Sequence, residues 1–137
     1  MGGAAGEIGG SKYGRQSRLE EIPEQRRPNG AVIRALVDKE SCGARIKTNT
    51  VSFPAGHVVE FHRHNCNEVI VVLEGDCAVE VEGTAPVALK PFDTVSVETG
   101  TWHRFLSTGA TGFTLLAIYD AERVERTLRD SGKTTID

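Results

Sequence analysis

The chain has 137 residues, which is enough for one domain with a single hydrophobic core but not for a second independent module. Its 16 basic and 19 acidic side chains give a net charge of −3 and are interspersed, so nothing indicates a nucleic-acid-binding surface. The longest unbroken aliphatic run, residues 69–73, is far shorter than the roughly twenty residues that cross a bilayer. We therefore expect neither nucleic acid nor a membrane as a partner.

Residues 1–30 predict a flexible N-terminal arm. Six glycines lie among the first fourteen residues, with almost no apolar side chains to bury, so residues 1–14 should be mobile. Residues 15–30 are polar and contain Pro23 and Pro28, and we expect them to lie across the main domain or a neighbouring subunit. The segment has neither a basic leader nor an apolar stretch of signal-peptide length, which favours a cytoplasmic protein.

Residues 31–137 are expected to form one all-β domain, with its core at about 45–120. Short segments rich in β-branched and aromatic residues are separated by Gly, Pro, Asp or Asn, a pattern typical of a β-sandwich or barrel. Turn residues at 74–76 and 108–112 favour antiparallel neighbours. The expected strands are 31–37, 45–53, 57–64, 68–74, 77–82, 86–89, 93–98, 103–107 and 113–119.

A change of period after Asp120 predicts a short C-terminal helix over residues 121–131. Ala121, Val124 and Leu128 would share one helical face, and two pairs of opposite charge stand four residues apart. Gly132 would then end the helix.

The three cysteines, Cys42, Cys66 and Cys77, are expected to be reduced thiols. Their number is odd and no CxxC spacing occurs, which argues against a disulfide framework and against a thiolate zinc site. Cys66 lies between candidate metal ligands, but burial is the simpler expectation for it than reactivity.

Two imidazoles and a carboxylate lie within seven residues, at His62, His64 and Glu68. Because His62 and His64 are two residues apart, their side chains leave the same face of a strand. Two neutral imidazoles and a carboxylate suit a divalent transition metal. Apart from His57, the only other histidine is His103, which makes it the natural fourth ligand.

The spacing from Gly56 to Gly75 resembles the first motif of the cupin superfamily, in which Gly, His-x-His, Glu and Gly occur in this order. A second cupin motif carries a single histidine further along the chain, and here Asp93, Gly100 and His103 fall in register with it.

This second motif departs from the family pattern at Phe92, Glu98 and Ser107, where cupins usually show Gly, Pro and Asn. The resemblance covers about residues 45–120 and implies a small jelly-roll β-barrel. It does not imply one reaction, since cupins include dioxygenases, isomerases, decarboxylases, lyases and plain binding domains. The metal ligands that the resemblance implies are His62, His64, Glu68 and His103.

Glu60 is the candidate catalytic residue. If the two histidines face the barrel interior, strand parity places Val58 and Glu60 inward and Val59 outward. An inward carboxylate beside the metal could orient a ligand imidazole, act as a general base, or be an ordinary acid at the barrel mouth. The same parity gives His57 an outward direction, so we do not include it in the site.

Ile70, Val72 and Phe105 share faces with the ligands and would form an apolar wall beside the metal. Such a wall excludes water and leaves room for a small molecule with a carbonyl, hydroxyl or carboxylate. The same three side chains would equally suit an ordinary barrel core.

The ligand set fits iron, manganese, nickel, cobalt, copper or zinc, and leaves coordination positions open for a substrate. An alternative is that the four side chains hydrogen-bond among themselves without metal, or hold one only for stability. With a metal, the protein would be a small-molecule enzyme that acts as a dioxygenase, an isomerase or a lyase. The alternative is a binding module for a sugar or other oxygen-rich metabolite.

We also expect a homodimer, because small barrels expose edge strands.

Overall fold

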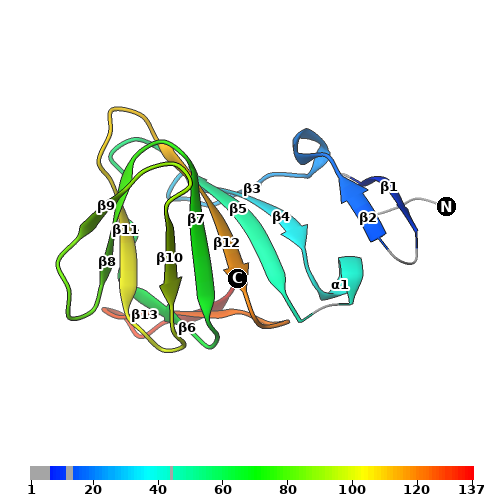
Figure 1. Cartoon of the computed structure of the whole chain (residues 1–137). Coiled ribbons are helices and arrows are strands. Elements are labelled where there is room, and N and C mark those ends of the chain that lie inside the picture. The colour runs from blue at the N-terminus through cyan, green and yellow to red at the C-terminus, as the bar shows by residue number, and fades with distance from the viewer. Residues whose placement is uncertain (1–6, 12–13, 44) are drawn as a thin grey trace.

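The computed structural model describes residues 7–11, 14–43 and 45–137. Strands dominate this part of the chain, and its helical elements are short (Figure 1). In chain order the elements are β1 (Glu7–Ser11), β2 (Gly14–Ser17), η1 (Leu19–Glu21), β3 (Gln25–Arg26), β4 (Val32–Val37), α1 (Lys39–Cys42), β5 (Lys47–Phe53), β6 (His62–His64), β7 (Glu68–Glu74), β8 (Cys77–Val81), β9 (Val87–Leu89), β10 (Thr94–Val97), β11 (His103–Ser107), β12 (Phe113–Tyr119), β13 (Glu125–Leu128) and β14 (Thr134–Ile136).

Two sheets face each other and enclose the core. Among the described residues, one sheet has the order β10-β7-β12-β5-β4-β3 and the other β14-β13-β6-β11-β8-β9, while β1 and β2 pair separately. Every strand pair is antiparallel, as in β7 against β12 and β8 against β11. The prediction of an all-β, jelly-roll-type barrel is therefore confirmed.

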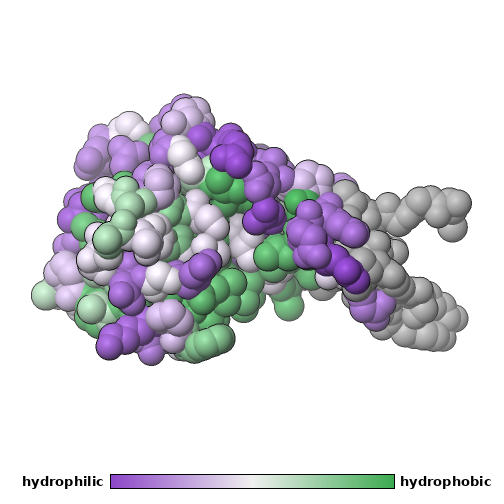
Figure 2. All heavy atoms as spheres, turned by 90° about the horizontal axis from the view of Figure 1, so that it is seen from above, coloured by the Kyte–Doolittle hydropathy of each residue, from purple (hydrophilic) through white to green (hydrophobic). Residues whose placement is uncertain are grey.

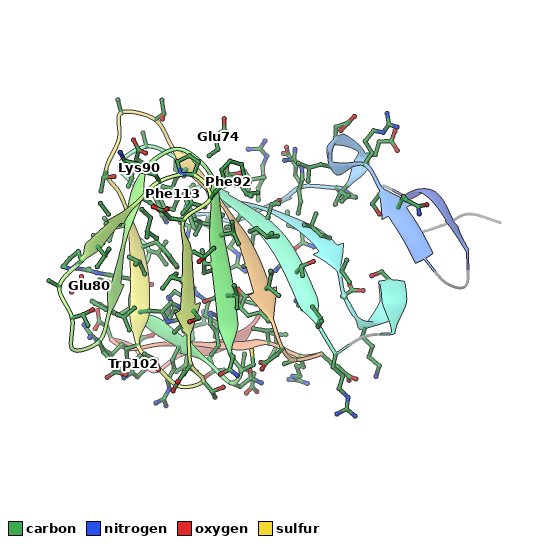
Figure 3. The ribbon with its side chains drawn as sticks, viewed as in Figure 1. Glu74, Glu80, Lys90, Phe92, Trp102 and Phe113 are labelled. Atoms are coloured by element: carbon green, nitrogen blue, oxygen red, sulfur yellow. The ribbon has the colours of Figure 1, made fainter. Side chains whose placement is uncertain are left out.

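The two-residue period of the sequence decides which side chains enter the core. In β12 the odd-numbered residues Phe113, Leu115, Ala117 and Tyr119 are buried, while the residues between them are only half-buried. Figure 3 shows Phe113 and Trp102 toward opposite ends of the strands. The core draws on both sheets: its members are Val59, Cys66, Ile70, Val72, Cys77, Val79, Leu89, Phe105, Phe113, Leu115, Ala117, Tyr119 and Val124.

The predicted turns between strands occur where backbone segments approach one another closely. Gly75, at the turn between β7 and β8, has φ of 78°, and a Cβ there would collide with the carbonyl oxygen of Gly112. A Cβ at Gly112 would in turn collide with the carbonyl oxygen of Phe53. These close approaches bring the β7–β8 turn, the loop before β12 and the end of β5 together at one end of the barrel.

The predicted helix over 121–131 is wrong, because this segment forms β13 and the hairpin that leads to β14. Backbone pairing with β6 determines the outcome: Arg126 lies opposite His64, and Leu128 opposite His62. Val124 is fully buried, which shows that tertiary packing outweighed the weak helical pattern. Gly132 serves the hairpin, where its N–H donates to the carbonyl of Leu128.

The N-terminal arm meets the barrel through its last residues. β3 extends the first sheet by pairing with β4, and Ile22 is buried. The hairpin of β1 and β2 lies apart from the two sheets (Figure 1). The expected mobility of residues 1–14 falls largely on positions outside the described residues, namely 1–6 and 12–13.

The surface is mixed in character. Figure 2 shows hydrophilic residues interspersed with smaller hydrophobic areas on the face seen from above. In the described ranges, no helix has the length and apolar character that a membrane-spanning helix requires.

Candidate metal centre

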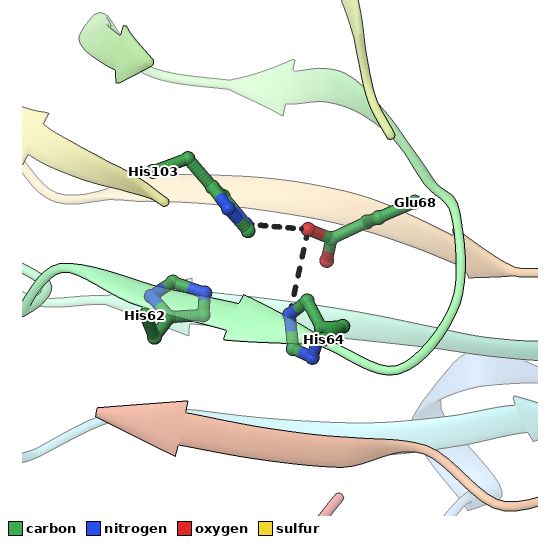
Figure 4. A group of neighbouring side chains, drawn as sticks. All are labelled: His62, His64, Glu68 and His103. Atoms are coloured by element: carbon green, nitrogen blue, oxygen red, sulfur yellow. Dashed lines mark hydrogen bonds and ion pairs between the residues drawn. The ribbon is translucent and has the colours of Figure 1, made fainter. Parts of the chain in front are cut away.

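The four predicted ligands meet inside the barrel. His62 and His64 come from β6, His103 from β11 and Glu68 from the start of β7 in the facing sheet. His62 lies directly opposite His103 in the antiparallel ladder, and parity brings His64 to the same face. One donor atom from each of the four side chains lies within 4.8 Å of the others (Figure 4).

All four side chains are removed from solvent. The exposed fractions are 5% for His62 and His64, 4% for Glu68 and 0% for His103. Ionisable groups are rarely buried to this degree unless they are paired or bind a metal.

Backbone carbonyls fix the tautomer of every imidazole. The Nδ1–H of His62 donates to the carbonyl of Glu60 at 2.8 Å, that of His64 to Glu125 at 3.0 Å, and that of His103 to Thr101 at 2.9 Å. A carbonyl oxygen only accepts, so Nδ1 must carry the hydrogen in each ring. The Nε2 lone pair of each neutral ring is therefore free to bind a metal, and this arrangement is usual for metal-bound histidine.

Glu68 supplies the negative charge of the cluster. Its Oε1 lies 2.9 Å from Nε2 of His103 and 3.6 Å from Nε2 of His64 (Figure 4). Burial alone would raise the pKa of Glu68, but the hydrogen bond with His103 and the proximity of His64 lower it below its usual value. The Tyr119 hydroxyl also donates to Glu68, and burial together with this carboxylate raises the pKa of that tyrosine, so it remains a donor.

The environment keeps the β6 imidazoles neutral. Burial, then the neighbouring His103 and Arg126, lowers the pKa of His62 to about 2. Burial also lowers the pKa of His64, although Glu68 and Asp137 oppose the shift. Neutral imidazole is the form that coordinates a metal.

The donor set fits a divalent transition metal better than it fits a closed hydrogen-bonded cluster. Nε2 of His64 is buried and has no hydrogen-bond partner among the described residues. When its hydrogen is on Nδ1, His103 presents the lone pair of Nε2 to the Glu68 carboxylate at 2.9 Å, and a proton or a cation between these two acceptors would join them. A metal ion at this point would satisfy all four groups, and three imidazoles with one carboxylate are suitable ligands for it.

A cavity of about 210 Å³ opens beside the cluster. Its wall includes Ile70 and Phe105, as predicted, together with Leu115. Val72 is buried in the core, but it is not part of this wall. The cavity is smaller than the roughly 300–1,000 Å³ typical of drug-sized ligands, which indicates a small substrate.

The structure changes the expected geometry around Glu60. Regular pairing in this strand begins only at His62, so parity does not extend backward: Val59 is 6% exposed, whereas Val58 is 51% exposed. The expected outward direction of Val59 is therefore wrong, whereas Val58 lines the cavity although half of it is exposed. Glu60 is exposed, yet it lines the cavity, and its carbonyl positions the His62 ring. A catalytic role for Glu60 stays a prediction.

The residues that line the cavity and were missed include His57, Asn49 and Arg126. His57 stacks on Phe53 with ring centroids 5.0 Å apart, and its outward direction was inferred from the same false parity. Arg126 was placed on a helix that does not exist. Asn49 has inward parity on β5, since it lies opposite the buried Ala117, and a polar residue at such a position was the available signal.

The side chain of Cys42 lies outside the described part of the structure, and the other two cysteines take no part in the cluster. Cys66 and Cys77 are buried and free, and burial raises the pKa of each thiol to about 11. Both therefore stay protonated near neutral pH, in agreement with the expectation of inert thiols.

An antiparallel barrel with three histidines and a glutamate inside it defines a class of small β-barrel proteins with an internal cluster that could hold a metal ion. Residues 49–119 match the family described as "Cupin domain", and this match covers more than half of the chain. The chain belongs to the cupin family. No curated protein sequence matches it.

Solved structures agree with this assignment at the level of the fold. A predicted oxalate decarboxylase from Thermotoga maritima is 24% identical, with a TM-score of 0.68 over 74% of this chain and 95% of that one. The polyketide cyclase RemF from Streptomyces resistomycificus is 16% identical, with a TM-score of 0.67 over 76% and 77%. An RmlC-like cupin from Shewanella frigidimarina is 21% identical, with a TM-score of 0.65 over 75% and 86%.

Proposed function

We propose that the protein is a metal-dependent enzyme that acts on a small, oxygen-rich molecule. The observation that carries the proposal is the convergence of donor atoms from three histidines and Glu68, beside a cavity whose lining includes His62, His64 and Glu68. Several structural neighbours are named as enzymes, including a polyketide cyclase and a predicted oxalate decarboxylase, which supports catalysis over simple binding.

The ion would be held by His62, His64, Glu68 and His103. A divalent transition metal supplies Lewis acidity at such a site, or dioxygen chemistry if it is redox-active. The ligand set does not select among iron, manganese, nickel, cobalt, copper and zinc.

The chain's own residues would orient the substrate and move protons. The Tyr119 hydroxyl holds the Glu68 carboxylate in place, while Ile70 and Phe105 keep water away from one side of the cavity. Glu60 lies on the cavity wall, from which its carboxylate would accept a proton from a substrate carbon or hydroxyl. Isomerisation or elimination would need such a base.

Incubation of the metal-loaded protein with small oxygen-rich compounds, followed by NMR detection of products, tests the proposal. We expect a product that Glu60→Gln removes at unchanged metal content, and oxygen uptake during turnover if the reaction is an oxidation. A protein that binds such compounds with metal but never yields a product would instead be the binding module considered above.

Two further expectations belong to this proposal. Exposed edge strands, such as β10 and β9 at the ends of their sheets, support a homodimer. The mass of the protein in solution, measured before and after deletion of residues 1–17, tests whether the hairpin of β1 and β2 contributes to the dimer.

The cytoplasmic location rests on the sequence composition alone, and fractionation of cells that express the protein tests it.

A further inference from the structure

Asn49 contributes a buried oxygen without a hydrogen-bond partner to the residues that line the cavity. It lies on β5 and is 5% exposed, and its Oδ1 has no hydrogen-bond partner among the described residues. Buried polar atoms are almost always hydrogen-bonded, so an unpartnered amide oxygen in a cavity wall indicates a polar ligand there.

Arg126 is the second unusual member of this wall. It lies on β13 opposite His64 and lines the cavity. Arg27 forms an ion pair with Asp137 at 3.1 Å, but in the described part of the chain no carboxylate lies within 4.0 Å of the Arg126 guanidinium.

The Arg126 guanidinium is close to the candidate metal ligands. Its charge lowers the pKa of both His62 and His57. Burial lowers the pKa of Arg126 itself, Asp137 opposes this shift, Arg27 adds to it, and Tyr119 and Glu60 oppose it more weakly. Arginine stays charged at neutral pH, so the cavity wall contains a partly buried cation.

The formal charge of the wall also favours an anion. Three acidic side chains, Glu60, Glu68 and Asp137, and two basic ones, Arg27 and Arg126, line the cavity. A bound divalent ion would change the sum from −1 to +1. A neutral sugar would leave this positive charge uncompensated.

We propose that the substrate of this site is a small carboxylate, whose carboxyl group pairs with Arg126 while another oxygen faces the metal ligands. The inference rests on the proposed function, because it assumes a metal at the four-residue cluster. The planar guanidinium suits a carboxylate, which it can bind through two parallel hydrogen bonds. The Asn49 amide would hydrogen-bond a further polar atom of the same molecule.

Two probes that share one metal-binding group distinguish binding at the metal from binding at Arg126. Acetohydroxamate chelates a metal without a carboxylate, and malonate monohydroxamate adds only a carboxylate to it. Calorimetric titration of both into the full chain loaded with Zn²⁺, which has no redox chemistry of its own, measures the contribution of the carboxylate. Zinc content is measured first in every sample.

We expect the carboxylated probe to bind wild type about 10- to 100-fold more tightly than acetohydroxamate, as for a hydrogen bond between charged groups. Arg126→Gln should abolish this preference and leave the affinity for acetohydroxamate unchanged, while Arg126→Lys should retain part of it. Arg45→Gln is the matched control, because Arg45 is 89% exposed and lies outside the cavity wall.

Equal affinity of zinc-loaded wild type for the two probes would overturn the inference alone, and this comparison needs no variant to fold. A preference that persists in Arg126→Gln would also overturn it. Failure of wild type to retain zinc would overturn the proposed function instead, and the inference with it.

Discussion

The stability of the metal-free protein should fall as the pH drops below 6.5, because the β6 histidines are neutral in the folded state. Burial lowers the pKa of His62 to about 2, and it also lowers that of His64. In the unfolded chain both imidazoles have the ordinary value of 6.5, so below this pH the unfolded state binds more protons than the folded state.

The sign and the size follow from this difference in bound protons. Each histidine contributes stability that is complete above pH 6.5 and is lost as the pH falls below it. Between pH 7.5 and 5.5 the loss is about 1.4 kcal/mol for His62, and His64 adds no more than the same amount, so the two together set an upper value of about 3 kcal/mol. Most carboxylates titrate below this window and contribute little to the difference.

Urea unfolding of the metal-free protein at pH 7.5, 6.5 and 5.5 measures the effect. The urea midpoint should fall with pH, and His62→Gln should lose about half of the pH dependence because glutamine does not titrate. His57 is only partly buried, so His57→Gln is the matched control and should retain most of the dependence. A free energy of unfolding that is constant, or that rises, between pH 7.5 and 5.5 would refute the reasoning.

Two phenylalanines test the assignment of the core, because Phe113 is 1% exposed and Phe92 is 79% exposed. In denaturant titrations, Phe113→Ala should lower the free energy of unfolding by about 3–5 kcal/mol, and Phe92→Ala should lower it by less than about 0.5 kcal/mol. Similar losses of stability in the two variants would contradict the fold. Tyr119→Phe removes the hydroxyl that donates to buried Glu68. It should destabilise the protein by about 2 kcal/mol in the same assay, and an unchanged midpoint would show that this hydrogen bond contributes nothing.

The strands were predictable because each has one buried face. β7 and β12 have the bounds that the sequence indicated, 68–74 and 113–119, since β-branched and aromatic residues fill both and turn residues bound them. The four ligands could also be predicted. His62 and His64 are two residues apart on a strand and so share a face, and the resemblance to the cupin motifs implied Glu68 and His103.

The errors arose where long-range pairing outweighs local pattern. Residues 122–129 have charges at helical spacing, but the backbone of residues 125–128 pairs with β6 on one side and with β14 on the other. Val58 and Val59 were assigned by extending the parity of β6 into an irregular segment, where an isolated bridge joins Val58 to Leu106. Sequence spacing alone cannot locate the point where a regular strand begins.

The cavity residues show the same limit. Arg126 enters the site only because β13 pairs with β6, and the arm contributes Arg27 only because β3 pairs with β4. Neither contact has a local signature in the sequence. Asn49 differs from them, because its inward parity on a predicted strand could have identified it as a polar residue in the core.

The most direct test of the account is the metal content of protein purified without added metal, measured by elemental analysis for wild type, His62→Ala and His57→Ala. We predict close to one divalent transition metal ion per chain in wild type and in His57→Ala, and little or none in His62→Ala. A folded wild type that neither retains nor takes up such an ion, or an equal metal content in all three proteins, would contradict the account.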